Sequence, residues 1–268
     1  MRRTREPSET EAALLVLAGD PVPVLRRLRN LRALGPFSLV PRPLSVIEDR
    51  YWDTKDHILG RKQLALRVRE YDGDPWITAK GPSKRTVGRK TVERFEVEMP
   101  WQRSVVRKKL VPLLENFGVL DASALEHGTW PTHRRAMTKM GLFPIQRRMT
   151  RRWPRDVFRS GRQSKAPLAE MAIDVVTYRI GSLSPKFAEV EIEMKGVPRR
   201  DAVEQFISLL LSQEGVTLMP LRAPKLAIGR ALTSFALNGE LAPKLGPHGW
   251  LTQNSFRAIR QALSRGLV

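Results

Sequence analysis

Charged side chains repeat at every second position in several segments of the sequence, and their types suit phosphate and metal chemistry. Carboxylates repeat in this way at Glu9 and Glu11, at Glu96 and Glu98, and at Glu189, Glu191 and Glu193. Guanidinium groups do so at Arg67 and Arg69. In an extended strand, residues i and i+2 lie on the same face, roughly 7 Å apart. Aligned carboxylates can bind a divalent cation, and aligned guanidinium groups can bind phosphate oxygens.

The residues between these charges are apolar. Leu66 and Val68 flank Arg67, Phe95 and Val97 flank Glu96, and Val190 and Ile192 flank Glu191. One such pair is also typical of a strand with a solvated face. Taken together, the segments indicate strands whose apolar faces pack against outer helices and whose charged faces line the interior of a barrel. Buried charges of both signs need compensation, which a metal ion and a bound polyanion would supply.

The hydropathy pattern predicts the elements that position these groups. Predicted strands cover residues 8–17, 37–40, 45–52, 63–71, 76–80, 91–99, 143–153, 168–180 and 187–195. Predicted helices cover residues 21–34, 101–117, 201–214, 224–237 and 251–267. Residues 81–85 read as a basic, polar loop. Successive strands of period two predict an α+β fold, namely a closed antiparallel β-barrel with flanking α-helices.

Composition narrows the classes of function. The 268 residues include 47 Lys and Arg against 27 Asp and Glu, a formal net charge of +20, so an anionic partner is expected. The absence of cysteine excludes disulfides, Cys-ligated zinc, iron–sulfur clusters and thiol nucleophiles. The longest apolar runs, Ala12–Ala18 and Phe206–Leu211, are too short to span a bilayer, so we expect a cytoplasmic protein without membrane contact. Aromatic residues make up 7% and form no stacking platform, which argues against nucleic acid.

In this order, the segments resemble the motifs of the CYTH superfamily, the triphosphate tunnel metalloenzymes, from about residue 6 to residue 237. That family includes inorganic triphosphatases, thiamine triphosphatases, class IV adenylate cyclases and fungal RNA triphosphatases. The first half contains five segments that correspond to family motifs. Glu9–Ala13 corresponds to E-x-E-x-K, Tyr51–Thr54 to Y-[FY]-D-T, and Leu64–Arg69 to L-x-L-R-x-R. Thr78–Gly81 corresponds to T-x-K-G, and Arg94–Glu98 to R-x-E-x-E. In the second half, an arginine-rich strand, an aspartate, E-x-E-x-E and a late lysine correspond to Arg147–Arg152, Asp174, Glu189–Glu193 and Lys225.

The resemblance implies metal-dependent hydrolysis of a triphosphate, inorganic tripolyphosphate above others, with Mg²⁺ or Mn²⁺ as the cofactor. The implied metal ligands are Glu9, Glu11, Glu96, Glu98, Asp174, Glu189, Glu191 and Glu193. The implied phosphate-binding residues are Arg67, Arg69, Lys80, Arg94, Lys225 and arginines of the strand 147–152. On that strand we expect Arg147 and Arg151 to point inward. By the same resemblance, Glu9, Glu11, Arg67, Arg69 and Lys80 form the catalytic set.

One position departs from the family pattern, because Ala13 replaces the lysine of E-x-E-x-K and a cation that would contact phosphate is lost. This loss leaves open a binding module for polyphosphate or nucleotides that lacks catalysis. Separately, the resemblance leaves open an adenylate cyclase that converts ATP to cAMP.

Two segments are predicted along the chain: a tunnel domain at residues 1–237, and a linker with a C-terminal helix at residues 238–268. Asn238, Gly239, Pro243, Gly246 and Pro247 mark the linker. The helix after it is similar to the first helix of a CHAD-like helical domain, which is associated with polyphosphate binding. It could equally pack back onto the barrel.

Overall fold

The computed structural model describes the backbone of residues 8–71, 74–85, 90–119, 132–159, 166–195 and 200–266, and most side chains within these ranges. The chain forms two compact units, which are described separately below. The first unit contains residues 47–83 and 94–148, and the second contains residues 9–46, 84–93 and 149–268. Among the helices that the structure describes, none combines the length and the hydropathy that crossing a membrane requires.

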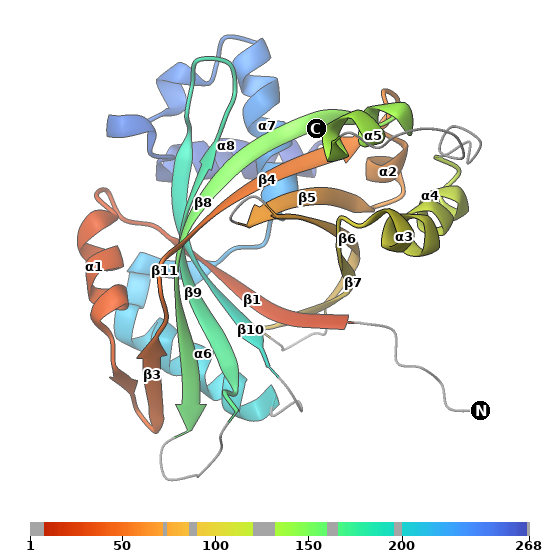
Figure 1. The fold of residues 1–268 in the computed structure, drawn as a ribbon. Helices are drawn as coiled ribbons and strands as arrows, with labels where there is room; N and C mark the ends of the chain where they lie inside the picture. Colours follow the sequence, from red (N-terminus) through yellow and green to blue (C-terminus); the bar gives the residue numbers. More distant parts are fainter. Residues whose placement is uncertain are drawn as a thin grey trace. The chain divides into compact units, whose positions relative to one another are not determined.

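The strands belong to one antiparallel sheet (Figure 1). They are β1 (Ser8–Val16), β2 (Ala33–Leu34), β3 (Phe37–Pro41), β4 (Ser45–Asp53), β5 (Ala65–Tyr71), β6 (Asp74–Arg85), β7 (Val92–Pro100), β8 (Phe143–Arg159), β9 (Ala169–Tyr178), β10 (Lys186–Met194) and β11 (Leu218–Pro220). Their order is β2-β3-β8-β4-β5-β6-β7-β1-β10-β9, with β11 paired to β1. A further pairing of β8 with β9 makes the sheet a nearly closed β-barrel, which confirms the predicted fold class.

In the first unit, alternation along the strands separates an apolar face from a charged face. The apolar side chains of β5 and β6, including Leu66, Val68 and Ile77, are buried in one cluster with residues of the surrounding helices. Those helices are α2 (Ile58–Arg61), α3 (Arg103–Val105), the π-helix η1 (Val106–Leu110), α4 (Val111–Asn116) and α5 (His133–Lys139). The intervening side chains of the strands, Arg67 and Thr78 among them, are therefore directed to the other face.

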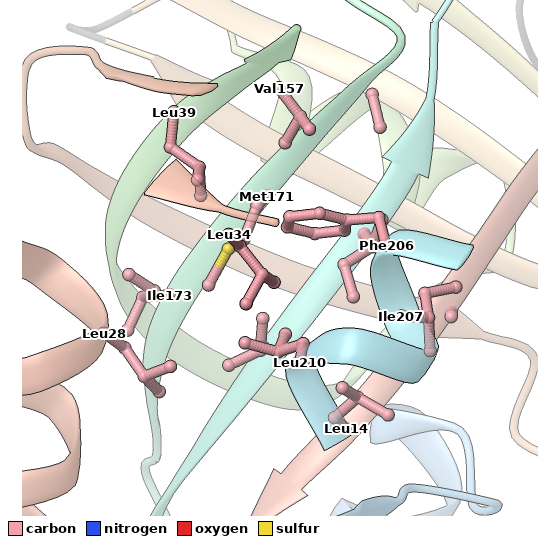
Figure 2. Close-up of a cluster of buried hydrophobic side chains, with 14 of the residues drawn as sticks. Leu14, Leu28, Leu34, Leu39, Val157, Met171, Ile173, Phe206, Ile207 and Leu210 are labelled. Carbon is pink, nitrogen blue, oxygen red and sulfur yellow. The ribbon is translucent and has the colours of Figure 1, made fainter. Parts of the chain in front are cut away.

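In the second unit, α1 (Val22–Asn30) and α6 (Arg200–Glu214) cover one face of β1, β9 and β10. Figure 2 shows Phe206, Ile207 and Leu210 of α6 directed toward the strand side chains, with Leu28 of α1 beside Ile173. Burial of these apolar side chains is the main stabilising contribution at this face. It fixes the register of the strands, because a shift by one residue would place their charged side chains in this core.

The opposite face of the same strands carries α7 (Lys225–Leu237) and α8 (Gln253–Ser264). Phe187 of β10 contacts Phe256 of α8 edge-to-face, with ring centroids 5.7 Å apart. Thr252 and Ser255 form a capping box that fixes the start of α8. The C-terminal helix thus packs onto the strands of the second unit, as one of the two alternatives expected.

Three predicted elements differ from those observed. The helix expected over residues 21–34 ends at Asn30, because Leu31 is extended and the chain turns into β2 and β3. The loop expected over residues 81–85 is a continuation of β6. The helix expected over residues 101–117 contains a π-helical turn, and Pro112, just after it, cannot donate a backbone hydrogen bond.

Candidate functional site

Three carboxylates gather on the face of β9 and β10 that carries α7. Asp174 and Glu189 are directly paired across the two strands, and Glu191 follows Glu189 on the same face. One oxygen from each of the three lies within 4.8 Å of the others. Asp174 and Glu189 have no solvent exposure, whereas Glu191 is half-buried. We call these three residues the acidic cluster.

Two cations accompany the acidic cluster. Arg152 of β8 donates from Nε to Asp174 Oδ1 at 2.9 Å and from Nη2 to Asp174 Oδ2 at 2.6 Å, and it also binds Glu191. Lys225, the first residue of α7, places its Nζ against the carboxylates of both Glu189 and Glu191. If all groups were ionised, the five side chains would together carry one negative charge, so the cluster can still accept positive charge.

The electrostatics of the acidic cluster single out Glu189. Burial raises its pKa to about 8, and the nearby charges of Glu191 and Asp174 add to the effect while Lys225 opposes it. Although burial lowers the pKa of Arg152, the carboxylates of Asp174 and Glu191 outweigh it and hold that pKa well above its usual range. Lys225 Nζ forms an ion pair with Glu189 Oε1, whereas Glu189 Oε2 has no hydrogen-bond partner within the described part of the chain. A buried carboxylate of this kind costs free energy unless a cation or a proton compensates it.

The donor set of the acidic cluster fits a hard divalent cation. Mg²⁺ and Mn²⁺ favour carboxylate oxygens, and Mg²⁺ commonly takes a few carboxylates together with substrate phosphate oxygens. Glu189 Oε2, which has no hydrogen-bond partner among the described residues, is a suitable ligand. The residues present are therefore compatible with a metal bound by Asp174, Glu189 and Glu191.

We expect the stability of the metal-free protein to fall as the pH rises toward 8. The folded state keeps a proton on Glu189 up to about pH 8, whereas the unfolded chain loses it near 4.5. Over that interval the folded state binds more protons, so raising the pH favours unfolding. Thermal melts at about pH 6 and pH 8.5 should show this loss for the parent protein and not for Glu189→Gln. An equal pH dependence in both proteins would contradict the assignment.

A second group of charges lies on the charged face of the first unit and is centred on Asp49 of β4. Arg69 donates from Nε to Asp49 Oδ1 at 2.7 Å, and Arg148 donates from Nη2 to Asp49 Oδ2 at 2.9 Å. Arg67 Nε lies 3.5 Å from Asp49 Oδ1. Although burial raises the pKa of the fully buried Asp49, the three guanidinium groups outweigh this and hold it well below its usual range. We call Asp49, Arg67, Arg69 and Arg148 the arginine cluster.

Neighbouring groups extend the arginine cluster. Tyr51 accepts a hydrogen bond from Arg148 Nη2 at 2.6 Å, and the cations around it lower its pKa despite its burial. Arg67 donates to Thr78 Oγ1 at 3.0 Å, and Thr78 donates in turn to Glu98 Oε1 at 3.2 Å. Lys80 forms an ion pair with Glu96, with an N–O distance of 2.7 Å. Three guanidinium groups around a single carboxylate leave a local positive excess that suits a phosphate chain.

The expectation that Arg147 and Arg151 point inward is wrong. Arg148 is buried and Arg152 is half-buried on one face of β8, whereas Arg147 and Arg151 are exposed on the other. Arg147 instead binds Glu48 at the surface, with an Nε–Oε1 distance of 2.9 Å. An apolar residue further along β8 could have indicated the correct face. Val157 packs in the hydrophobic core formed with α1 and α6, and it lies on the same face of β8 as Arg147 and Arg151.

The structure brings together three of the eight predicted metal ligands. Glu193 binds Lys195 instead of joining the acidic cluster, and Glu11 is its cross-strand partner. Glu96 and Glu98 belong to the first unit and make the contacts given above. The side chains of Glu9 and Arg94 lie outside the described residues.

Sequence reasoning missed Asp49 and Arg148. Nothing in the local pattern marked Asp49, because it precedes the Tyr51–Thr54 motif in a strand of mixed polarity. Ala13, the position without the family lysine, is the cross-strand partner of Glu191. The cation that reaches Glu191 from a different element is Lys225.

Comparisons with known proteins agree with this fold. The family model described as the CYTH domain matches residues 42–217, which is more than half of the chain. Among curated protein sequences, no significant match is found. Among the solved structures that resemble this chain at low sequence identity are the following two. One is HpAC1 from Hippeastrum, described as revealing a dominant triphosphatase activity, with 18% identity, a TM-score of 0.48, and coverage of 83% of this chain and 95% of that one.

The other is a candidate adenylate cyclase from Bacillus halodurans, with 15% identity, a TM-score of 0.48, and coverage of 81% of this chain and 95% of that one. The family assignment rests on the family-model match and not on these distant structural likenesses. The chain belongs to the CYTH domain family.

Proposed function

We propose that the protein hydrolyses a triphosphate in the presence of Mg²⁺ or Mn²⁺, and that inorganic tripolyphosphate is its preferred substrate. The observation that carries the proposal is the acidic cluster, in which three carboxylate oxygens converge and the buried Oε2 of Glu189 has no hydrogen-bond partner among the described residues. Asp174, Glu189 and Glu191 would hold the metal. When bound, the metal supplies charge neutralisation on the phosphate and lowers the pKa of a bound water.

The residues of this chain would do the remaining work through positioning and charge. Arg152 and Lys225, which lie against the carboxylates of the acidic cluster, would direct N–H groups toward phosphate oxygens. Arginine suits this role because its planar fork holds two oxygens at once. Phosphoryl transfer needs such electrostatic stabilisation more than a protein nucleophile.

Within the first unit, we further propose that the arginine cluster is a phosphate-binding site. Asp49 holds three guanidinium groups in fixed orientations, so their ordering is already achieved before the ligand arrives. Lys80 would add a fourth cation. We favour an inorganic chain because the side chains of the acidic cluster, with Arg152 and Lys225, are suited to binding a metal ion and phosphate oxygens.

A screen of phosphate release tests the proposal directly. Tripolyphosphate, ATP and thiamine triphosphate would each be offered with and without Mg²⁺ or Mn²⁺, and cAMP would be measured alongside. Phosphate release from tripolyphosphate that requires metal is the expected result. Formation of cAMP would favour the cyclase, and binding without turnover would favour a module that lacks catalysis.

We expect Lys80→Gln to weaken tripolyphosphate binding by about tenfold or more, because one charge-assisted hydrogen bond contributes roughly 1.5–3 kcal/mol. Its fold should be preserved, since the side chain is on the charged face of β6 and keeps some exposure. Lys139→Gln, at an exposed position of α5, is the matched control and should bind like the parent. Calorimetric titration of both variants gives the comparison. Equal affinities would exclude Lys80 from phosphate binding.

A further inference from the structure

Arginines also gather on the face of β8 that points away from the acidic cluster. Successive side chains of a strand point to opposite faces. On β8, the side chains of Arg151, Trp153 and Arg155 are therefore directed to the face opposite that of Arg152. Helix α1 adds Arg29, and the segment after it adds Arg32. All of these residues belong to the second unit. We call Arg29, Arg32, Arg151, Trp153 and Arg155 the outer arginine surface.

Contacts among these residues show that their guanidinium groups are close together. The Cζ atom of Arg29 lies 4.4 Å from the ring centroid of Trp153, and that of Arg151 lies 5.5 Å from it. Arg32 Nη1 donates to the carbonyl of Arg29 at 3.5 Å, and Arg155 Nη1 donates to the carbonyl of Leu31 at 3.0 Å. Burial lowers the pKa of Arg155, and the neighbouring charges of Arg32 and Arg29 lower it further.

This positive charge is not compensated within the described part of the protein. There, none of the four arginines forms an ion pair with a carboxylate, and Arg155 Nε has no hydrogen-bond partner although the residue is buried. Nearby arginines do have such partners, since Arg27 binds Glu214 and Arg42 binds Glu170. The C-terminal end of a helix attracts cations, which explains why Arg32 and Arg155 contact carbonyl groups at the end of α1. It does not account for Arg151, whose guanidinium group lies over the ring of Trp153.

We propose that the outer arginine surface is a binding site for linear inorganic polyphosphate. Several exposed guanidinium groups within reach of one another can each take two oxygens of successive phosphates. Two guanidinium groups already lie over Trp153, so its ring is occupied and does not offer a stacking platform for nucleic acid bases. This site is additional to the proposed hydrolytic site, and it would retain phosphate chains longer than the triphosphate.

Binding of long-chain polyphosphate would be measured with metal chelated, so that hydrolysis does not interfere. Arg29→Gln/Arg151→Gln should bind the long chain about tenfold more weakly than the parent at low ionic strength, as the loss of two exposed charge contacts predicts. Arg257→Gln/Arg260→Gln on α8 removes the same charge from another exposed face and should bind like the parent. Metal-dependent hydrolysis of tripolyphosphate should be unchanged in both variants.

Arg32→Gln, a single change at an exposed position, serves as a second variant whose fold is not in question, and it should show a smaller loss in the same direction. Equal losses in the two double variants would overturn the proposal and indicate non-specific attraction to net charge. A loss confined to a single-stranded oligonucleotide, with polyphosphate binding intact, would overturn it in favour of nucleic acid. Because binding is measured without metal, either outcome is independent of whether the protein hydrolyses tripolyphosphate.

Discussion

Glu189→Gln should fold, lose the stabilisation that Mn²⁺ gives the parent, and lose most metal-dependent hydrolysis. Glu189 is fully buried with a pKa of about 8, so at neutral pH an amide replaces a largely protonated carboxyl group at small cost. A metal at one hundred times its Kd stabilises the folded parent by about 2.7 kcal/mol. For a chain of this size, that corresponds to a rise in melting temperature of roughly 5–10 °C. We expect hydrolysis to fall by about a hundredfold or more.

Thermal melts and phosphate release with and without Mn²⁺ measure both effects. Glu193→Gln is the matched control, because Glu193 lies on the same strand but binds Lys195 outside the acidic cluster. It should retain both the metal-induced shift and the activity. If Glu189→Gln still gains the full shift with Mn²⁺, the acidic cluster is not the metal site and the hydrolytic proposal loses its main support.

Asp49→Asn should be the most destabilising single change in the arginine cluster. It leaves Arg67, Arg69 and Arg148 close together without the buried carboxylate that they share. Removing one partner from a buried ionic group typically costs about 3–5 kcal/mol. Urea unfolding of parent and variant measures the loss. Asp56→Asn, at an exposed position of the same unit, should unfold like the parent.

Two further measurements separate a lost charge from a packing defect at Asp49. The pKa of Asp49 is depressed in the folded state, so its contribution is present above the unfolded pKa of about 3.9 and is lost as the pH falls through the folded value. The stability difference between parent and Asp49→Asn should therefore stay constant near neutral pH and shrink only in acid. Added tripolyphosphate should also restore more stability to the variant than to the parent. No such recovery would contradict phosphate binding by these arginines.

Strand periodicity was sufficient to predict the barrel, because charged and apolar side chains alternate over residues 66–69 of β5 and residues 188–194 of β10. It also placed Glu189 and Glu191 on one face. It could not choose the face of β8, where arginines occupy both sides at Arg147, Arg148, Arg151 and Arg152. In β8, the face to which each arginine side chain points is set by packing elsewhere along the strand, because Val157 is buried in the core with residues of α6.

Contacts distant in sequence account for the rest of what sequence reasoning did not find. Asp49 meets Arg148 across a separation of 99 residues, and no local pattern encodes that pairing. The outer arginine surface likewise requires α1 and β8 to lie together. The short elements α2, α5, β2 and β11 were missed because segments of this length carry too few residues to show a period.

The position of Lys225 links the C-terminal helices to the chemistry of the acidic cluster. This lysine is the first residue of α7, its carbonyl accepts a hydrogen bond from Tyr178 Oη at 2.8 Å, and α8 packs beside α7. Any change that loosens α8 would therefore shift the lysine that balances Glu189 and Glu191. Coupling free energies are reciprocal, so occupation of the carboxylates by a metal must in turn alter the local opening of α7 and α8. Helix α8 contributes no residue to the acidic cluster, yet its amide hydrogen exchange should respond to the state of that cluster through α7 and Lys225.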